Sequence, residues 1–291
     1  MLNNMMSYLL PRLNRGLMRT FPVSPTGILS SLWQNLDLVK VLVSREIVGR
    51  YKGSLLGLLW AFFNPLFMLA VYTFVFSVVF KSRWGAGSTT DSRAEFALVL
   101  FAGMLMFNLL AECLNRAPSL ILINTTYVKK VVFPLEILPW VSLGTALFHT
   151  GVSFGVWLLF FIVVFGPPPV TIMLFPLLMV PFCLLIMGLS WLLASLGVYL
   201  RDVGQVIGIL TTALMFLTPI FYPISSIPET YRTILLFNPL TFIVDQARDL
   251  LIFGKGMAWK PFFVLTICSL GVAWLGYAWF QKTRKGFADV L

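Results

Sequence analysis

Long runs of apolar residues, separated by segments rich in charge, Pro or Gly, make up most of this 291-residue chain. A helix that crosses a hydrocarbon layer of about 30 Å needs about 20 such residues. Runs near that length or longer cover about 55–80, 96–113, 141–165, 170–200, 204–222 and 259–280. The pattern therefore predicts an all-α membrane protein with six transmembrane helices.

The distribution of positive charge predicts how these helices are oriented. Arg45, Arg50 and Lys52 directly precede the first run, and cations beside a span hold that end in the cytoplasm. With the first span running outward, 14 of the 21 Lys and Arg residues fall on the cytoplasmic side. Both termini are therefore predicted to be cytoplasmic, with 1–28 a basic tail and 286–291 a short C-terminal end.

The first run has two internal features that bear on helix packing. Gly53, Gly57 and Ala61 recur every four residues, which predicts a smooth helical face for close contact with another helix. Pro65 follows Asn64 within the run. Because proline lacks a backbone donor, we expect a kink at that point.

Apolar residues also recur at helical spacing over 29–50, where charged residues are too frequent for a membrane span. This segment predicts an N-terminal amphipathic helix that lies in the cytoplasmic interface. Two interpretations stay open. The helix anchors the chain to the membrane, or it borders the path by which a substrate arrives.

Two further segments are predicted to be helical without crossing the membrane. Within residues 117–130, a helix from Ser119 to Lys129 should stand on the cytoplasmic side, exposed and partly apolar, which suits the docking of a partner protein. Residues 225–253 contain two apolar stretches separated by Asn238 and Pro239. We predict that they form two short re-entrant helices in the outer leaflet, shielded by protein.

The composition excludes several classes of function. Hydrophobic residues make up 59% of the chain and the mean hydropathy is +0.91, values outside the range of soluble domains. Topology and anionic membrane lipids explain the net charge of +10 better than nucleic acid does. The three cysteines lie in or beside apolar runs, and no spacing typical of metal ligands occurs.

Candidate chemistry within the chain is sparse. His149, the single histidine, is open to two interpretations, a structural hydrogen bond or a proton relay. The acidic residues on the predicted outer side are scattered and are interpreted as solvated, so no catalytic residue is predicted. The sequence has no phosphate loop for a nucleotide, and energy for uphill transport would have to come from another chain.

Five motifs occur in order along the chain. They are RYKGSLLGLLW at 50–60 with Asn-Pro at 64–65, KKVVFPLEILP at 129–139, YLRDV at 199–203, LTPIFYPISSIPETYR at 217–232 and FNPLTFIVDQARDLL at 237–251. In these motifs the chain, from about residue 30 to 285, resembles the type-2 ABC exporter permeases for bacterial polysaccharides. That group handles O-antigen, capsule and teichoic acid.

The resemblance implies a homodimer of six-span subunits in the bacterial inner membrane, each bound to an ATP-binding cassette subunit. ATP and Mg²⁺ would bind in that partner, whereas this chain, a permease domain over 29–285, would hold no cofactor and would not be an enzyme. The substrate would be a polysaccharide linked to polyprenyl pyrophosphate. By the same resemblance, 117–130 would couple to the ATPase and 225–253 would form the periplasmic gate helices.

Three groups of candidate site residues follow. Those predicted to meet the pyrophosphate group at the cytoplasmic gate are Arg45, Arg50, Tyr51, Lys52, Lys129 and Lys130. Those predicted to contact the ATPase are Ser119, Asn124 and Tyr127. Those predicted to line the glycan path, since sugar rings pack on aromatic faces, are Trp60, Phe63, Tyr72, Phe76 and Phe107. The cations could equally be membrane anchors, and the aromatic residues could face lipid.

Two other functions are compatible with the sequence. One is an ABC exporter of the same architecture for a lipid or a drug, because the sequence does not distinguish a long glycan path from a shorter lateral gate. A membrane-bound transferase or ligase that acts on lipid-linked glycan is the other alternative, and a catalytic base at the membrane surface would mark it.

Overall fold

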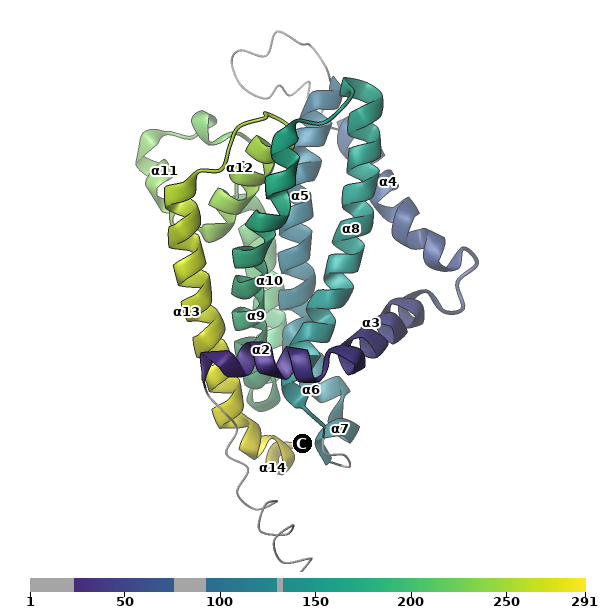
Figure 1. The fold of residues 1–291 in the computed structure, drawn as a ribbon, viewed down its shortest axis with the longest axis vertical. Coiled ribbons are helices and arrows are strands. Elements are labelled where there is room, and N and C mark those ends of the chain that lie inside the picture. Colours follow the sequence, from purple (N-terminus) through teal and green to yellow (C-terminus); the bar gives the residue numbers. More distant parts are fainter. Residues whose placement is uncertain (1–23, 76–92, 130–132) are drawn as a thin grey trace, which may run out of the picture.

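The computed structural model describes residues 24–75, 93–129 and 133–291 (Figure 1). Within these ranges every element of regular secondary structure is helical. The segments long and apolar enough to cross a membrane are Gly57–Val75, Ala94–Ile123, Leu135–Phe165, Val170–Tyr199 and Trp259–Val290. The prediction of an all-α, multi-pass membrane protein is therefore confirmed.

One helix, α5 (Arg93–Arg116), forms the centre of the bundle (Figure 1). Its neighbours are α8 (Leu138–Phe165), α9 (Phe175–Tyr199), α10 (Val203–Leu217) and α12 (Pro239–Leu251). On α5 the residues from 96 to 102 are all at most 4% exposed. Trp157 of α8 is fully buried and donates from its indole nitrogen to the Leu98 carbonyl at 3.1 Å. The core of the fold therefore follows the first half of α5.

Helices α9 and α13 (Trp259–Thr283) pack so closely that their backbones touch. A Cβ atom added at Gly276 would lie 2.0 Å from the Gly188 carbonyl oxygen, and one added at Gly188 would lie 2.4 Å from the Val272 carbonyl oxygen. Small residues allow such an approach, and van der Waals contact between membrane helices then stabilises the pair.

The single helix predicted over 29–50 is two helices, α2 (Pro25–Gln34) and α3 (Leu36–Tyr51). Asn35 separates them, because its side-chain amide donates to the Ser31 carbonyl at 2.8 Å. A side chain that hydrogen-bonds locally competes with the backbone ladder of a helix. The start of this region also lies four residues earlier than expected, at Pro25.

Apolar residues lie on both sides of α3, so the predicted amphipathic pattern is only partly correct. Val39 and Leu42 are buried against the start of α8, whereas Val41 and Val48 are 64% and 59% exposed. Both α2 and α3 lie across the bundle near the end that holds the C-terminus (Figure 1). An apolar outer side suits a helix that contacts lipid at the edge of the membrane.

The first span begins later than predicted, because α4 (Trp60–Tyr72) starts at Trp60 rather than at residue 55. Gly53 and Gly57 lie in the turn before it with φ angles of 85° and 51°, a left-handed conformation that glycine adopts without steric cost. The predicted face of Gly53, Gly57 and Ala61 is therefore wrong, since Gly53 lies in a turn, Gly57 begins a short 3₁₀ helix (Gly57–Leu59), and only Ala61 belongs to α4. Pro65 lies inside α4 as expected, and residues 76–80 of the predicted span lie outside the described part.

The single helix predicted from Ser119 to Lys129 is not formed, because the segment consists of a 3₁₀ turn (Ala117–Ser119), α6 (Leu120–Ile123) and α7 (Thr125–Lys129). Asn124 separates α6 from α7, because its side chain donates to the Leu120 carbonyl at 2.8 Å. The short C-terminal α14 (Phe287–Val290) lies beside α7 at this end of the bundle (Figure 1).

The predicted span at 204–222 contains only the 15-residue helix α10. It stops at Leu217, because Thr218 precedes Pro219 and the residue before a proline is pushed into an extended conformation. At a rise of 1.5 Å per residue, α10 is about 22 Å long, short of the about 30 Å of a bilayer core.

Two short helices occupy the segment predicted at 225–253: α11 (Glu229–Leu236) and α12. Asn238 stands between them and caps α12, since its side-chain oxygen accepts from the Leu240 N–H at 3.0 Å. Both helices lie at the end of the bundle opposite α7 and α14 (Figure 1).

Arg248 anchors α12 to the core and is only 1% exposed. It donates to the carbonyl oxygens of Val99 at 3.0 Å, Pro219 at 2.6 Å and Ile220 at 2.7 Å. Asp245, one turn earlier, lies 3.4 Å from the same guanidinium group. The interpretation of the outer acidic residues as simply solvated is therefore wrong for Asp245, which pairs with a buried arginine.

Candidate functional site

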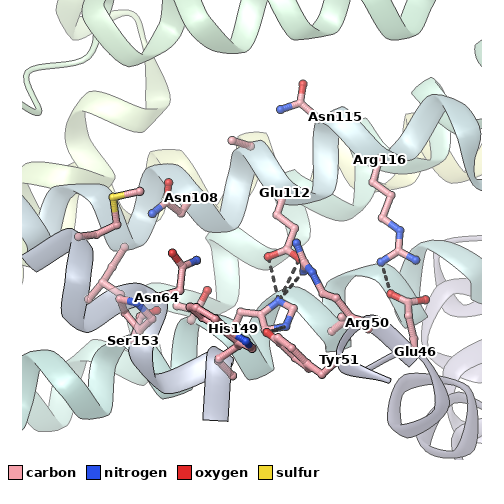
Figure 2. Close-up of a pocket in the computed structure, with 18 of the residues that line it drawn as sticks. Glu46, Arg50, Tyr51, Asn64, Asn108, Glu112, Asn115, Arg116, His149 and Ser153 are labelled. Carbon is pink, nitrogen blue, oxygen red and sulfur yellow. Dashed lines mark hydrogen bonds and ion pairs between the residues drawn. The ribbon is translucent and has the colours of Figure 1, made fainter. Parts of the chain in front are cut away.

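A cavity of about 1130 Å³ lies between α3, α4, α5 and α8. Polar side chains from all four helices lie around it in Figure 2. Its volume exceeds the about 300–1,000 Å³ of ordinary small-molecule sites. The arrangement therefore suits a ligand that is large or extended.

The three membrane helices at the cavity, α4, α5 and α8, present residues to it at helical spacing, so that one face of each is turned towards it. These residues include Trp60, Asn64, Met68 and Tyr72 on α4; Leu105, Asn108, Glu112 and Asn115 on α5; and Thr145, His149 and Ser153 on α8. From Leu105 to Arg116 the cavity follows α5 for about 16 Å at the helical rise.

Four side chains in the cavity form one connected group, which we call the Arg50 cluster: Arg50, Tyr51, Glu112 and His149 (Figure 2). Arg50 Nη1 donates to Glu112 Oε1 at 2.5 Å. His149 Nδ1 lies 3.0 Å from the same oxygen, and the Tyr51 hydroxyl lies 3.2 Å from His149 Nε2. Glu112 on α5 is therefore held by α3 and by α8 at once.

His149 Nδ1 lies between two charged groups, 3.0 Å from Glu112 Oε1 and 3.1 Å from Arg50 Nη1. We assign the ring hydrogen to Nδ1, where it points at Glu112, because a carboxylate accepts hydrogen bonds and does not donate them. Nε2 then accepts from the Tyr51 hydroxyl. Burial raises the pKa of Tyr51, against the opposing effect of Arg50, and the phenol keeps the proton that it donates.

Two further polar contacts join α3 to the bundle. Glu46 of α3 forms an ion pair with Arg116 of α5 at the edge of the cavity (Figure 2). Arg45 donates to the Tyr127 hydroxyl of α7 at 3.0 Å. Through these contacts and the Arg50 cluster, α3 meets α5, α7 and α8.

The predicted gate residues separate into those in the cavity and those outside it. Arg50 and Tyr51 line the cavity, whereas Arg45 contacts α7 and Lys52 is exposed just beyond the end of α3. The side chain of Lys129 and the whole of Lys130 lie outside the described part of the chain. The role of all six residues at a gate stays a prediction.

The predicted coupling residues all contact other parts of the same chain. The Ser119 hydroxyl donates to the Arg116 carbonyl at 2.9 Å, and Asn124 breaks the helix as described above. Tyr127 stacks on Phe133 with ring centroids 4.4 Å apart. Their contact with an ATPase stays a prediction.

The predicted path residues are not all gathered in the cavity. Trp60 and Tyr72 line it. Phe63 lies on α4 outside the set of lining residues, and Phe107 is only 6% exposed within the core of the bundle. Phe76 lies outside the described residues. Their contact with a glycan stays a prediction.

The cavity also contains polar residues that the sequence-based prediction did not include in the site, above all Glu112, Asn108 and Ser153. The sequence allows two interpretations of His149, and its contacts with Glu112 and Tyr51 place it in a hydrogen-bonded group. The signal that could have identified them is the spacing of polar residues four apart within apolar runs. Asn108 and Glu112 show it on α5, and His149 and Ser153 show it on α8.

The chemistry that the cavity offers is binding through hydrogen bonds and paired charges. Its polar lining consists of amides, hydroxyl groups, one imidazole and two Arg–Glu pairs. Among the described residues, no group of three or more His, Cys, Asp or Glu side chains is arranged to hold a metal ion. A ligand rich in hydroxyl groups, or one with an anionic group at the α3 end, would match this lining.

Known proteins resemble the chain over most of its length. The family model described as ABC-2 type transporter matches residues 37–252. The chain is 27% identical over 264 residues to the O-antigen export system permease protein RfbA of Myxococcus xanthus, covering 90% of this chain and 98% of the relative. It is 24% identical over 257 residues to the protein of that name from Klebsiella pneumoniae, covering 88% and 95%. It is 25% identical over 245 residues to the polysialic acid transport protein KpsM of Escherichia coli, covering 81% and 91%.

Proposed function

Because the chain belongs to the ABC-2 type transporter family, we propose that it is the membrane-spanning permease subunit of an ABC exporter for a bacterial polysaccharide. The relatives that align over most of both chains carry the names of O-antigen export permeases and of a polysialic acid transport protein. On this proposal the chain is a transporter subunit and not an enzyme, and its place is the bacterial inner membrane.

One observation carries the proposal: the cavity along α5 has a lining that suits a sugar chain. Asn64, Asn108 and Ser153 offer donors and acceptors to sugar hydroxyl groups. Trp60 and Tyr72 offer ring faces on which a pyranose ring can pack. A cavity that follows a helix for about 16 Å also favours an extended ligand over a compact one.

The substrate would be linked to polyprenyl pyrophosphate, whose diphosphate group would be recognised at the α3 end of the cavity. Arg50 and Arg116 both line that end. Guanidinium groups bind phosphate oxygens through paired N–H donors, which supports this assignment. Anionic membrane lipids would contact the exposed cations outside the cavity.

Six crossings with both termini in the cytoplasm would complete the topology. Thr211 in α10 donates to Asn115 near the end of α5, at 3.0 Å. The carbonyl of Ile220, just after α10, meets Arg248, which also binds Val99 near the start of α5. Because the chain passes from one end of α5 to the other over this short stretch, α10 would serve as the fifth crossing. α11 and α12 would then be re-entrant at the outer side.

The energy would come from ATP and Mg²⁺ bound in a separate ATP-binding cassette subunit. The α6–α7 segment supports this proposal, since it projects at one end of the bundle and its Ile123 is 73% exposed. A second copy of the chain would complete the transporter. Phe67 on α4 and Phe74 just beyond its end are 65% and 60% exposed, and they are available for contact with that copy or with lipid.

The test is export in cells that lack the chain and receive it back in altered form. Ser153→Trp places a large ring in the cavity, whereas Val163→Trp places the same ring on a 75%-exposed position of the same helix. We expect loss of surface polysaccharide with Ser153→Trp and normal export with Val163→Trp, at equal amounts of protein in the membrane. Full-length lipid-linked glycan should accumulate on the cytoplasmic face.

Two results would contradict the proposal. If cells lacking the chain display normal surface polysaccharide, an exporter of a lipid or drug becomes the better interpretation. If the glycan accumulates at the outer face of the inner membrane instead, the chain acts after translocation, as a transferase would. The side on which the glycan collects is read with a glycosidase that cannot cross the membrane.

A further inference from the structure

Polar contacts, rather than buried apolar side chains, hold the second half of α3 to the bundle. The buried residues of α3, Val39 and Leu42, both lie in its first half. Residues 44–51 are exposed or only partly buried, and they reach α5, α7 and α8 through the Arg50 cluster and two further polar contacts. The position of this half therefore depends on contacts that a charged ligand can replace.

Arg50 is the member of the Arg50 cluster that a ligand can reach most easily. Its side chain is 53% exposed, while those of Glu112 and His149 are 23% and 16% exposed. A guanidinium group binds carboxylate and phosphate through the same forked geometry. A phosphate group that enters the cavity therefore competes with Glu112 for one cation.

His149 allows Glu112 to give up that cation. A partly buried carboxylate that lost its last donor would carry a desolvation penalty, which would oppose the exchange. His149 Nδ1 lies 3.0 Å from Glu112, and because His149 belongs to α8, this contact joins two helices other than α3 (Figure 2). Glu112 keeps one hydrogen bond when Arg50 turns to another anion.

We propose that Glu112 occupies the anion site of Arg50 while the cavity is empty of substrate, and that the pyrophosphate group of the substrate displaces it. The displacement removes one of the two ion pairs between the second half of α3 and α5, and the Glu46–Arg116 pair is the other. This inference rests on the proposed function and concerns how substrate binding is regulated. Glu112 and His149 act as positioning residues that set the affinity of Arg50 for a diphosphate. Among the described residues that line the cavity, Arg50 and Arg116 are each paired with a glutamate, so an incoming dianion reaches either cation by displacing a carboxylate.

The test compares variants of the full chain in phosphatidylcholine nanodiscs by calorimetric titration with farnesyl pyrophosphate. Glu112→Gln removes the competing charge, and we expect binding about tenfold tighter, because Arg50 then has no carboxylate to release and the diphosphate no longer meets a nearby negative charge. Glu112→Ala repeats the test with a different side chain. His149→Leu leaves Glu112 dependent on Arg50 and should weaken binding several-fold, the opposite direction.

Asp37→Asn is the matched control. It also removes one negative charge from the region of α3, but Asp37 is fully solvent-facing, outside the cavity, and pairs only loosely with Lys40 at 3.6 Å. Its affinity for farnesyl pyrophosphate should equal that of the unaltered chain. If either Glu112 variant binds no tighter than Asp37→Asn, Glu112 is not a competitor and the proposal is overturned.

A second arm separates the two sources of phosphate. In nanodiscs that contain phosphatidylglycerol, the advantage of Glu112→Gln should persist, because the cavity then prefers the diphosphate. Loss of that advantage would mean that bilayer phospholipid fills the site, and the assignment to substrate would be overturned. Failure of this inference differs from failure of the proposed function, since surface polysaccharide in cells lacking the chain is measured independently of any titration.

Discussion

Two arginines at opposite ends of the bundle are held in different ways. Arg248 on α12 is 1% exposed and donates to three backbone carbonyls, those of Val99, Pro219 and Ile220. Arg50 on α3 is 53% exposed and donates to the carboxylate of Glu112. Arg248 is therefore held by the backbone of the bundle, whereas Arg50 is held by a side chain, Glu112, that also contacts His149.

The difference shows which end of the molecule is built to change. A backbone carbonyl within packed helices cannot turn away, so the cation that it holds stays in place. A carboxylate that has a second donor can release its cation without becoming unsatisfied. We therefore expect the Arg248 end to determine stability and the Arg50 end to determine ligand binding.

The largest effect is expected from Arg248→Met. The change leaves buried carbonyls and Asp245 without their cation, and breaking a buried charged contact typically costs about 3–5 kcal/mol. We expect a large fall in the thermal unfolding midpoint of the purified chain, measured by tryptophan fluorescence. Arg248→Lys keeps the positive charge but loses the forked guanidinium donors. Its unfolding midpoint should lie between those of the unaltered chain and Arg248→Met. A midpoint equal to that of the unaltered chain would contradict the anchoring role.

A moderate effect is expected from Gly276→Ala, which tests rigidity along the same framework. The new methyl group would meet the Gly188 carbonyl at 2.0 Å and force α13 away from α9. Overpacking of this kind costs about 1–3 kcal/mol. Gly49→Ala on α3 is the control, because nothing lies within 4 Å of its added Cβ. Equal unfolding midpoints for the two variants would show that the backbone contact is not required.

The smallest effect on stability is expected from Glu112→Gln, although its effect on ligand binding should be large. A pair with one half-exposed partner contributes only about 0–1 kcal/mol to folding, and His149 still contacts the amide oxygen through Nδ1. We expect an unfolding midpoint close to that of the unaltered chain. A fall as large as that of Arg248→Met would place Arg50 in the framework and remove the contrast between the two ends.

The membrane character and most helices could be predicted from sequence, because an apolar run of sufficient length is a local property. The breaks at Asn35 and Asn124 were missed, since each depends on one side chain that hydrogen-bonds to a carbonyl four residues earlier. The stripe of Gly53 and Gly57 was misread for a related reason. The same glycines that would smooth a helix also permit the left-handed turn that precedes α4.

The candidate site was only half predictable. Arg50 and Tyr51 were expected from their place beside the first span, because cations at a membrane edge are visible in sequence. Glu112 and His149 are 37 residues apart and meet Arg50 only through the packing of three helices. Nothing in their separate surroundings distinguishes a cavity-lining polar residue from one that simply faces a neighbouring helix.

The sequence by itself determined that this chain crosses a membrane, where its basic segments lie, and which family its motifs resemble. These follow from the cost of placing charge in hydrocarbon and from the length of apolar runs, both of which are read along the chain. Only the tertiary structure decided which cation is held by backbone and which by a carboxylate. That choice depends on which atoms of distant helices come within hydrogen-bonding distance, and no local pattern contains that information.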